Sequence, residues 1–132
     1  MNPIKIICTL ILLQGLAGCT TEPTTLEDGQ SKVNLQAQPG DEMIARRLDE
    51  ERSKKLKYFI VSSGEHKMEL GIVKWDYQER RRTCLAALSF RDFLPNQRYD
   101  LVESSGLGRN VTVTLIDSKG NTIAKNDKVA CL

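Results

Sequence analysis

The sequence predicts a small, mainly β protein: an antiparallel β-sandwich with Greek-key-like connections, preceded by a flexible tether and a short charged helix. Three observations lead to this prediction. From about residue 56 onward, apolar residues alternate with polar ones or form short runs. Residues typical of turns separate these segments at regular spacing. Residues 20–40, by contrast, are polar and rich in Thr, Glu, Gln and Pro.

The first eighteen residues have the composition of an export signal. Lys5 supplies a positive charge, an apolar run covers residues 6–13, and the small residues of Ala17-Gly18 stand directly before Cys19. The apolar run is shorter than the roughly 20 residues that a helix needs to cross a bilayer. We therefore expect residues 1–18 to be a signal peptide and not a membrane span.

The tetrad Leu16-Ala17-Gly18-Cys19 resembles the lipobox of bacterial lipoproteins. The resemblance implies that the cysteine thiol takes a diacylglycerol, that residues 1–18 are removed, and that the new amino terminus is acylated. Several acyl chains anchor a protein firmly, whereas one chain binds only marginally. Thr20 stands where Gram-negative relatives carry Asp as an inner-membrane retention mark, so the resemblance implies an outer-membrane lipoprotein facing the periplasm. No cofactor is expected besides this covalent lipid.

The polar segment that follows is expected to be a linker. Residues 19–40 have few large apolar side chains, and a coil of about 20 residues has a root-mean-square reach of roughly 25 Å. Such a linker would hold the folded part clear of the lipid head groups. Val33 and Leu35 alternate with polar neighbours, which leaves a short strand as the alternative.

The next segment, residues 41–55, is expected to form a charged helix. Asp41 is a suitable N-cap after Pro39-Gly40, and Ile44 and Leu48 fall four residues apart among many charged residues. The apolar stripe is thin, so the helix is expected to be solvated. The alternative is a helix that docks onto a partner.

Residues 56–132 are expected to form the β-domain. Gly71 interrupts one alternating segment and predicts either a bulge or a strand covered on both faces. Residues 117–121, with the sequence Asp-Ser-Lys-Gly-Asn, are typical of a tight hairpin. The expected strands cover residues 56–61, 68–75, 84–90, 99–102, 111–115 and 122–124, and the tail near 129–131.

The segment from Phe93 to Tyr99 carries Pro95 between an apolar residue and the tyrosine. It resembles the tyrosine corner of Greek-key sandwiches such as fibronectin type III domains. The resemblance implies that the Tyr99 hydroxyl bonds back to the backbone of the corner. The immunoglobulin pattern is not supported, because Trp75 precedes both cysteines of the domain.

Two of the four cysteines remain to form a disulfide. Cys8 leaves with the signal peptide and Cys19 carries the lipid, so Cys84 and Cys131 are the free pair in an oxidising compartment. Closing a loop of about 48 residues would contribute roughly 4 kcal/mol in the chain-entropy model. The alternative is two buried thiols. No metal site is expected, because His66 is the only histidine and the spacing has no ligand pattern.

The charge balance and the motifs point away from nucleic acids and from catalysis. The chain has a net charge of +2, and removal of Lys5 leaves about +1. His66 lies in a polar segment that predicts an exposed turn, so no Ser-His-Asp triad is expected. No pair of acidic residues lies in an apolar setting. We therefore expect that this protein is not an enzyme, and no small-molecule substrate is evident from the sequence.

One cluster is a candidate binding patch. Arg80, Arg81 and Arg82 follow one another just before the strand of Cys84, with Trp75 and Tyr77 close in sequence. Adjacent guanidinium groups attract anions, and aromatic side chains concentrate binding energy at interfaces. The expected ligands are lipopolysaccharide phosphates, peptidoglycan carboxylates or an acidic protein face. The alternative is a solvated loop.

These features favour a tethered domain that acts by binding a protein partner in the cell envelope. Its layout is similar to that of small lipoproteins that help secretion or pilus machinery assemble at the outer membrane, so we expect an accessory or assembly factor. The alternative function is a periplasmic inhibitor of a lytic hydrolase such as lysozyme, in which the arginines enter the acidic cleft of the enzyme.

Overall fold

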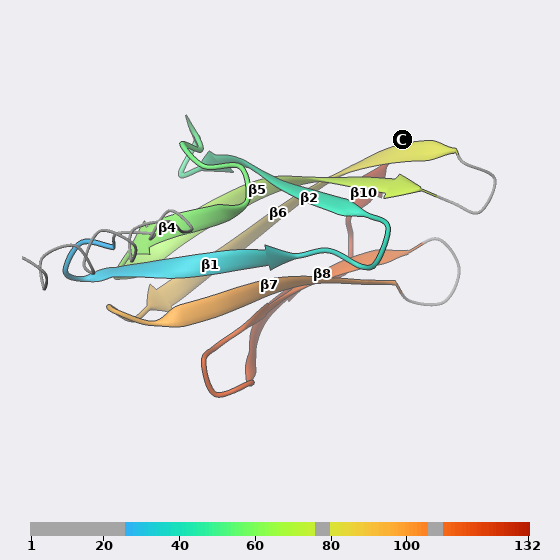
Figure 1. The fold of residues 1–132 in the computed structure, drawn as a ribbon. Helices are drawn as coiled ribbons and strands as arrows, with labels where there is room; N and C mark the ends of the chain where they lie inside the picture. Colours follow the sequence, from blue (N-terminus) through green and yellow to red (C-terminus); the bar gives the residue numbers. More distant parts are fainter. Residues whose placement is uncertain (1–25, 76–79, 106–109) are drawn as a thin grey trace, which may run out of the picture.

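The computed structural model describes residues 26–75, 80–105 and 110–132. The predicted signal peptide, Cys19 and the first part of the predicted linker lie outside the described residues. The described residues form ten strands in two five-stranded sheets (Figure 1). Sheet A has the order β4 (Tyr58–Ser62), β1 (Gln30–Gln36), β7 (Arg98–Ser105), β8 (Val111–Ile116) and β9 (Thr122–Asn126). Sheet B has the order β10 (Ala130–Cys131), β6 (Arg81–Phe93), β5 (Gly64–Trp75), β2 (Glu42–Leu48) and β3 (Glu51–Arg52).

The mainly β prediction is confirmed. Every expected strand between residue 56 and the end of the chain has a counterpart in β4 to β10. The recorded strand pairs are antiparallel except for β1 and β7, which run parallel. Figure 1 shows β2, β5 and β6 in one layer and β1, β7 and β8 in the other.

One hydrophobic core joins the two sheets. In β8 the buried residues Val111, Val113 and Leu115 alternate with threonines, and in β5 Met68 and Leu70 are fully buried. This alternation places one face of each strand against the core, since successive side chains of a strand point to opposite faces. Burial of each large apolar side chain contributes about 1.5–3 kcal/mol. The shared core is the main attachment between the layers.

The helix predicted for residues 41–55 is wrong. Residues 42–48 form β2 and residues 51–52 form β3. The spacing of Ile44 and Leu48 suggested a helix, but the residues that enter the core are Met43 and Ala45, at the period-two spacing of a strand. Pairing with the long strand β5 outweighs the weak helical pattern.

The linker prediction is also wrong for its second half. Residues 30–36 form β1, which lies between β4 and β7 and pairs with both. The alternation of Val33 with polar neighbours was the correct signal, since Val33 is fully buried. The β-domain therefore begins well before residue 56. Polar composition was misleading because β1 contributes few core side chains and a full set of backbone hydrogen bonds.

The corner between β6 and β7 has the bond expected of a tyrosine corner. The Leu94 N–H donates to the Tyr99 hydroxyl oxygen at 2.9 Å, and the Tyr99 ring packs edge-on against Phe93. The buried Ser31 hydroxyl of β1 donates to the Leu94 carbonyl at 2.6 Å and accepts from the Gln97 N–H at 2.9 Å. These bonds fix the path by which the chain crosses from sheet B to sheet A.

Candidate functional site

The predicted binding patch is split between two faces of the β5–β6 hairpin. Trp75 lies directly opposite Arg81, and Lys74 lies opposite Arg82. Because side chains alternate, Trp75 and Arg81 share one face while Arg82 belongs to the other. Arg80 is exposed just before β6, and Tyr77 lies outside the described residues. The structure therefore brings together Trp75 and Arg81, and separates Arg82 from them.

Trp75 and Arg81 lie on the face of sheet B that points away from the core, which we call the outer face. Trp75 is 51% exposed, and Leu85 on the same face of β6 is 48% exposed. Leu85 lies opposite Gly71, which has no side chain to cover it. Large apolar side chains that remain accessible beside cations are typical of surfaces that bind other molecules.

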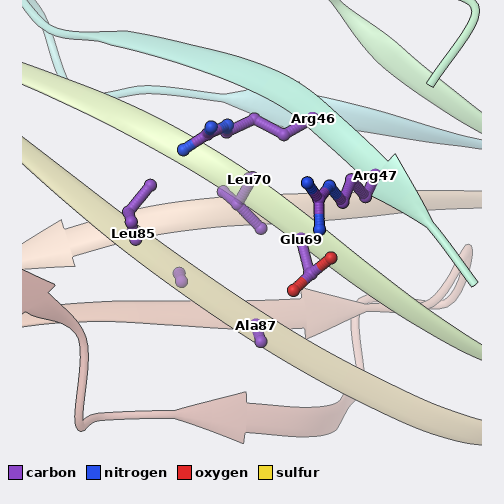
Figure 2. Close-up of a pocket in the computed structure, with 7 residues that line it drawn as sticks. Arg46, Arg47, Glu69, Leu70, Leu85 and Ala87 are labelled. Carbon is purple, nitrogen blue, oxygen red and sulfur yellow. The ribbon is translucent and has the colours of Figure 1, made fainter. Parts of the chain in front are cut away.

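A hollow lies in the outer face further along the same strands. Its volume is about 290 Å³, and Figure 2 shows guanidinium, carboxylate and apolar groups around it. The lining residues are Arg46, Arg47, Glu69, Leu70, Leu85, Ala86 and Ala87. The hollow thus combines two cations, one carboxylate and an apolar floor, which suits a partner that is partly anionic and partly apolar.

A β-bulge explains why two neighbouring arginines reach this face. Ala45 pairs with Leu70 and Arg47 with Glu69, so that Arg46 is the extra residue of β2. The Arg46 side chain then runs across Gly71, where its Cδ lies 3.4 Å from the position that a Cβ would take. Of the two alternatives predicted at Gly71, the bulge is absent, since this glycine is in register with both neighbouring strands. The other alternative holds here, because residues 70–73 are all buried and β5 is thus covered on both faces. The role of Gly71 is to leave room for the arginine.

Glu69 lies in the same hollow with an incomplete set of partners. Its Oε2 atom is buried and has no hydrogen-bond partner among the described residues. A buried carboxylate oxygen without a donor is unfavourable by about 1–3 kcal/mol or more. The hollow therefore holds an acceptor that a bound donor would satisfy.

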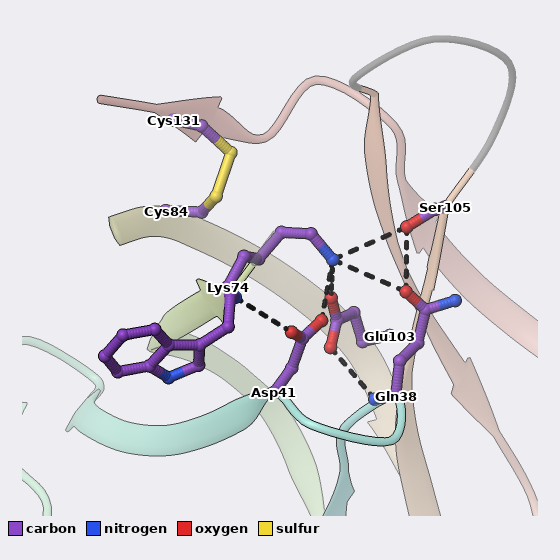
Figure 3. The surroundings of a disulfide bond; sticks show 8 residues. Gln38, Asp41, Lys74, Cys84, Glu103, Ser105 and Cys131 are labelled. Atoms are coloured by element: carbon purple, nitrogen blue, oxygen red, sulfur yellow. Dashed lines mark hydrogen bonds and ion pairs between the residues drawn. A yellow bond between two sulfur atoms is a disulfide. The ribbon is translucent and has the colours of Figure 1, made fainter. Parts of the chain in front are cut away.

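A second group of charges lies between the two sheets, next to Trp75 (Figure 3). The Lys74 ammonium of β5 is 2.7 Å from Asp41 Oδ2 and 2.6 Å from Glu103 Oε2 of β7. Glu103 Oε1 accepts from the Gln38 N–H at 3.0 Å, and the Glu103 side chain has no exposed area. We call Lys74, Asp41, Glu103, Gln38 and Ser105 the inter-sheet ion cluster. Because it links sheet B to sheet A, it fixes the end of the β5 strand.

The pKa values in this cluster favour ionised Lys74 and Asp41. Burial lowers the pKa of Lys74, but hydrogen bonds to the two carboxylates outweigh burial and raise it above its ordinary value. Burial raises the pKa of Asp41, but hydrogen bonds from Lys74 and Trp75 N–H bring it below the ordinary value. Burial raises the pKa of Glu103, and Lys74 offsets this only in part. One ammonium thus serves two carboxyl groups.

The cluster also positions the aromatic residue of the binding patch. The Trp75 backbone N–H donates to Asp41 Oδ1 at 3.3 Å. Asp41 is held in turn by Lys74, so the backbone that presents the indole ring is tied to both sheets. A site built on such a rigid element holds its side chains more precisely than a loop does.

The predicted pairing of Cys84 with Cys131 is confirmed at disulfide distance. Figure 3 shows the bond near the inter-sheet ion cluster. Cys84 is fully buried in β6, and β10 pairs with β6 at Cys131 and Ala130. The bond therefore fastens the end of the chain to the strand that carries Arg81 and Leu85.

His66 is not the exposed turn residue that the sequence predicted. It lies in β5, its Nδ1 is 2.5 Å from Asp49 Oδ2, and its Nε2 is 3.1 Å from Ser62 Oγ. Its Nε2 is also 2.8 Å from the Ser62 carbonyl oxygen, which can only accept. Both ring nitrogens of His66 are therefore engaged, one by the Asp49 carboxylate and the other by Ser62. The Ser62, His66 and Asp49 side chains thus connect the β2–β3 turn to β5.

Residues 26–75, 80–105 and 110–132 contain no group of three His, Cys, Asp or Glu side chains arranged to hold a metal ion. The same ranges contain no helix with the length and hydropathy of a membrane span.

Comparison of the chain with protein-family models, with curated proteins and with solved structures finds no match.

Sequence reasoning missed the arginines of β2 and the inter-sheet ion cluster. Arg46 and Arg47 were assigned to a solvated helix, where they would face different directions. The signal for a strand was the alternation of Met43 and Ala45, but it covers too few residues to outweigh the charged surroundings. No local pattern joins Lys74 to Glu103, because the two residues meet only when the sheets pack together.

Proposed function

We propose that this chain is a bacterial outer-membrane lipoprotein that acts by binding and not by catalysis. Its anchor is the lipid on Cys19, and its binding surface is the outer face of sheet B. The partner is a protein of a secretion or pilus-type envelope machinery, which the tethered domain helps to assemble. The lipobox-like tetrad at Leu16 to Cys19 supports the anchor.

The observation that carries the binding proposal is the exposure of Trp75 and Leu85 beside arginines on one sheet face. Trp75 is 51% exposed and faces Arg81 across the hairpin. Tryptophan and arginine are enriched among the residues that dominate the binding energy of protein interfaces, and tryptophan buries a large area at low entropic cost. The guanidinium groups favour a partner face that is acidic at its rim and apolar at its centre.

The architecture that we propose for the domain is a Greek-key-like β-sandwich. It is supported by two sheets that share one core and by the Tyr99 corner that carries the chain between them. In a sandwich the two outer faces are the broad surfaces, and one of them is free for a partner.

Site-specific photocrosslinking in the producing bacterium tests the binding surface. A photoreactive phenylalanine analogue replaces Trp75 or Leu85 in the full chain, and Lys119, exposed in the hairpin after β8, serves as the control position. We expect the same protein adduct from positions 75 and 85 and none from 119. Adducts of equal yield from all three positions, or none from 75 and 85, would contradict the proposal.

The anchor is tested by replacing Cys19 with serine. We expect the full chain to fractionate with the outer membrane and the Cys19→Ser variant to appear in the periplasmic fraction. Membrane fractionation of both proteins would remove the lipid anchor from the proposal. The photocrosslinking result would still stand, because it reports on a different part of the chain.

Inhibition of a lytic hydrolase is the second candidate, and the place of Trp75 and Arg81 favours it. Both residues lie at the end of the longest strand pair among the described residues, β5 and β6. A projecting hairpin with a cation and an indole ring suits the acidic cleft of a glycosidase. Loss of lysozyme activity in the presence of residues 26–132, relieved by Arg81→Gln, would favour inhibition over assembly.

A further inference from the structure

Three arginines converge on the outer face of sheet B at the end opposite Trp75. Arg46 and Arg47 share this face because of the β-bulge in β2. The turn after β2 is tight, since Asp49 and Glu50 both have positive φ angles, of 51° and 72°. It brings Arg52 of β3 directly opposite Arg47. Seven residues of sequence thus place three guanidinium groups together.

The surrounding acidic residues do not neutralise these arginines. Asp49 pairs with His66 through its Oδ2, and its Oδ1 accepts from the Lys67 N–H at 2.8 Å. Glu50 lies 3.3 Å from the Lys67 ammonium. Among the described residues, the cations that form ion pairs are His66, Lys67, Lys74 and Arg91, and no ion pair includes Arg46, Arg47 or Arg52.

Glu69 is the one carboxylate that faces this group across the sheet. It lies opposite Arg47 in β5, yet its Oε2 atom has no partner among the described residues, and no ion pair joins it to the arginine. Like charges placed directly opposite each other destabilise a strand pair. The Arg47–Arg52 pair is therefore a repulsive contact that a bound anion would relieve.

Space for such an anion exists on both sides of the arginines. Arg46 and Arg47 line the hollow of Figure 2 and also a second hollow of about 490 Å³, which Arg52 shares. Ser53 and Leu56 also line the second hollow, and Leu56 is 62% exposed. A charged group held by the guanidiniums would therefore have a hydroxyl and an apolar side chain beside it.

We propose that Arg46, Arg47 and Arg52 form a binding site for a phosphoryl group. A carboxylate offers two oxygens and one charge, which a single guanidinium fork satisfies. A phosphate monoester offers three oxygens and a charge of about −1.5 to −2, so it can engage several forks at once. Three guanidinium groups faced by one carboxylate, Glu69, leave an excess of positive charge, which matches the second group better than the first.

This site lies on the same outer face as Trp75 and Arg81, at the other end of it, and the hollow of Figure 2 extends from Arg46 and Arg47 to Leu85. Phosphate binding is measured without a protein partner, so its failure is distinguishable from failure of the proposed function. The phosphoryl group has two possible sources, the head group of an anionic lipid and a soluble phosphate ester. Exposed Leu56 beside the second hollow suits either a lipid or the carbon part of an ester. The experiment below distinguishes the two sources and leaves acidic peptides as a further outcome.

Titration followed by nuclear magnetic resonance tests the site. The sample is residues 26–132, which contain every described strand and the whole described core. Inorganic phosphate is added at constant ionic strength, with sodium acetate as the matched carboxylate. We expect saturable shifts of the arginine Nε–H signals with phosphate, and at least tenfold weaker binding of acetate.

The variant Arg46→Gln/Arg47→Gln/Arg52→Gln removes the guanidinium forks. We expect its phosphate affinity to fall at least tenfold. The matched control is Lys54→Gln/Lys55→Gln/Lys57→Gln, which removes three neighbouring exposed cations. We expect the control to retain affinity within about twofold. If the triple arginine variant does not fold, Arg52→Gln alone takes its place, with an expected loss of at least threefold.

Vesicles identify the source of the phosphoryl group. Arginine-dependent binding to phosphatidylglycerol vesicles, with none to phosphatidylcholine vesicles, would assign the site to an anionic lipid. Binding of inorganic phosphate without vesicle binding would assign it to a soluble ester. The proposal is overturned by acetate binding as tight as phosphate, which indicates an acidic peptide site. It is also overturned by equal losses in the arginine and lysine variants, or by no saturable binding in either titration.

Discussion

The inter-sheet ion cluster and the three arginines of β2 and β3 differ in burial and pairing. The charges of the cluster are buried and paired, whereas the arginines are exposed and take part in none of the ion pairs among the described residues. In the cluster, Lys74 lies between Asp41 and Glu103, all three side chains are largely buried, and the distances are 2.6–2.7 Å. On the outer face, Arg47 lies opposite Arg52, and both side chains are exposed. Buried charges must be paired, whereas exposed charges can remain available.

The difference indicates which charges hold the fold and which are left for a ligand. The cluster joins β5 to β7, so its loss would loosen one end of the contact between the sheets. No ion pair among the described residues links the three arginines to another element. We therefore expect substitutions in the first region to change stability, and substitutions in the second to change binding.

The largest expected effect comes from the disulfide beside the cluster. Replacement of Cys84 and Cys131 by alanine should lower the free energy of unfolding by roughly 4 kcal/mol, because the unfolded chain regains the freedom of a loop of about 48 residues. Urea unfolding measures the change, and the reduced natural protein should match the variant. A loss under about 1 kcal/mol would mean that β10 does not depend on the bond.

Lys74→Met is the sharpest test of the paired region. It leaves Asp41 and Glu103 without their shared ammonium group, and removal of one partner from a buried ion pair costs about 3–5 kcal/mol. We expect a loss near the lower value, about 3 kcal/mol, because Glu103 can take up a proton. Lys67→Met is the control, since Lys67 and Glu50 form an exposed pair. Its expected loss is under about 1 kcal/mol.

The pH dependence sharpens the same comparison. The pKa of Lys74 is raised above its ordinary value of 10.5 in the folded protein. Its contribution is therefore fully present below about pH 10.5 and is lost as the pH rises through the folded pKa. The stability difference between the natural protein and Lys74→Met should thus narrow above pH 10.5. A difference that stays constant between pH 8 and pH 11.5 would contradict this assignment.

At acidic pH, the contribution of the cluster to the free energy of unfolding should depend less on pH than it does above pH 10.5. The pKa of Asp41 is lowered, so its contribution is present above the ordinary value of 3.8 and is lost as the pH falls. The pKa of Glu103 is raised, so protonation of this carboxyl favours the folded state as the pH falls through it. The two effects have opposite signs and partly cancel.

Tyr99→Phe should have a smaller effect, far from the charged regions. The variant keeps the ring packing against Phe93 and removes the acceptor for the Leu94 N–H. A lost buried hydrogen bond with an unpaired donor left behind costs about 1–3 kcal/mol, and we expect about 1 kcal/mol because water can reach the exposed Leu94. Thermal unfolding measures the change. No change in the midpoint would show that the corner bond is dispensable.

Much of the fold was accessible from the sequence because β strands leave a local pattern. The alternation of Val111, Val113 and Leu115 with threonines predicted β8 directly, and the turn at residues 117–121 predicted its pairing with β9. The strands before residue 56 were not predicted, because their local alternation of apolar and polar residues is weak. Their core contribution is limited to a few residues such as Val33 and Ala45, and the abundant charges favoured other structures.

The candidate site was only partly accessible. Trp75 and Arg81 could be found because they are close in sequence and a hairpin brings them opposite each other. The prediction that Arg82 shares their surface is wrong, because adjacent residues of a strand face opposite sides. The arginines of β2 and β3 depend on a bulge and on a turn with positive φ angles, and neither has a reliable signal in one sequence.

The most direct test of the account is the unfolding free energy of Arg46→Gln/Arg47→Gln/Arg52→Gln in phosphate-free buffer at low salt. If these arginines are held for a ligand, removing them relieves repulsion between Arg47 and Arg52. The variant should then be as stable as the natural protein or more stable by up to about 1 kcal/mol. A loss of more than about 1 kcal/mol would show that the arginines hold the fold, and would contradict the division between stabilising and binding charges.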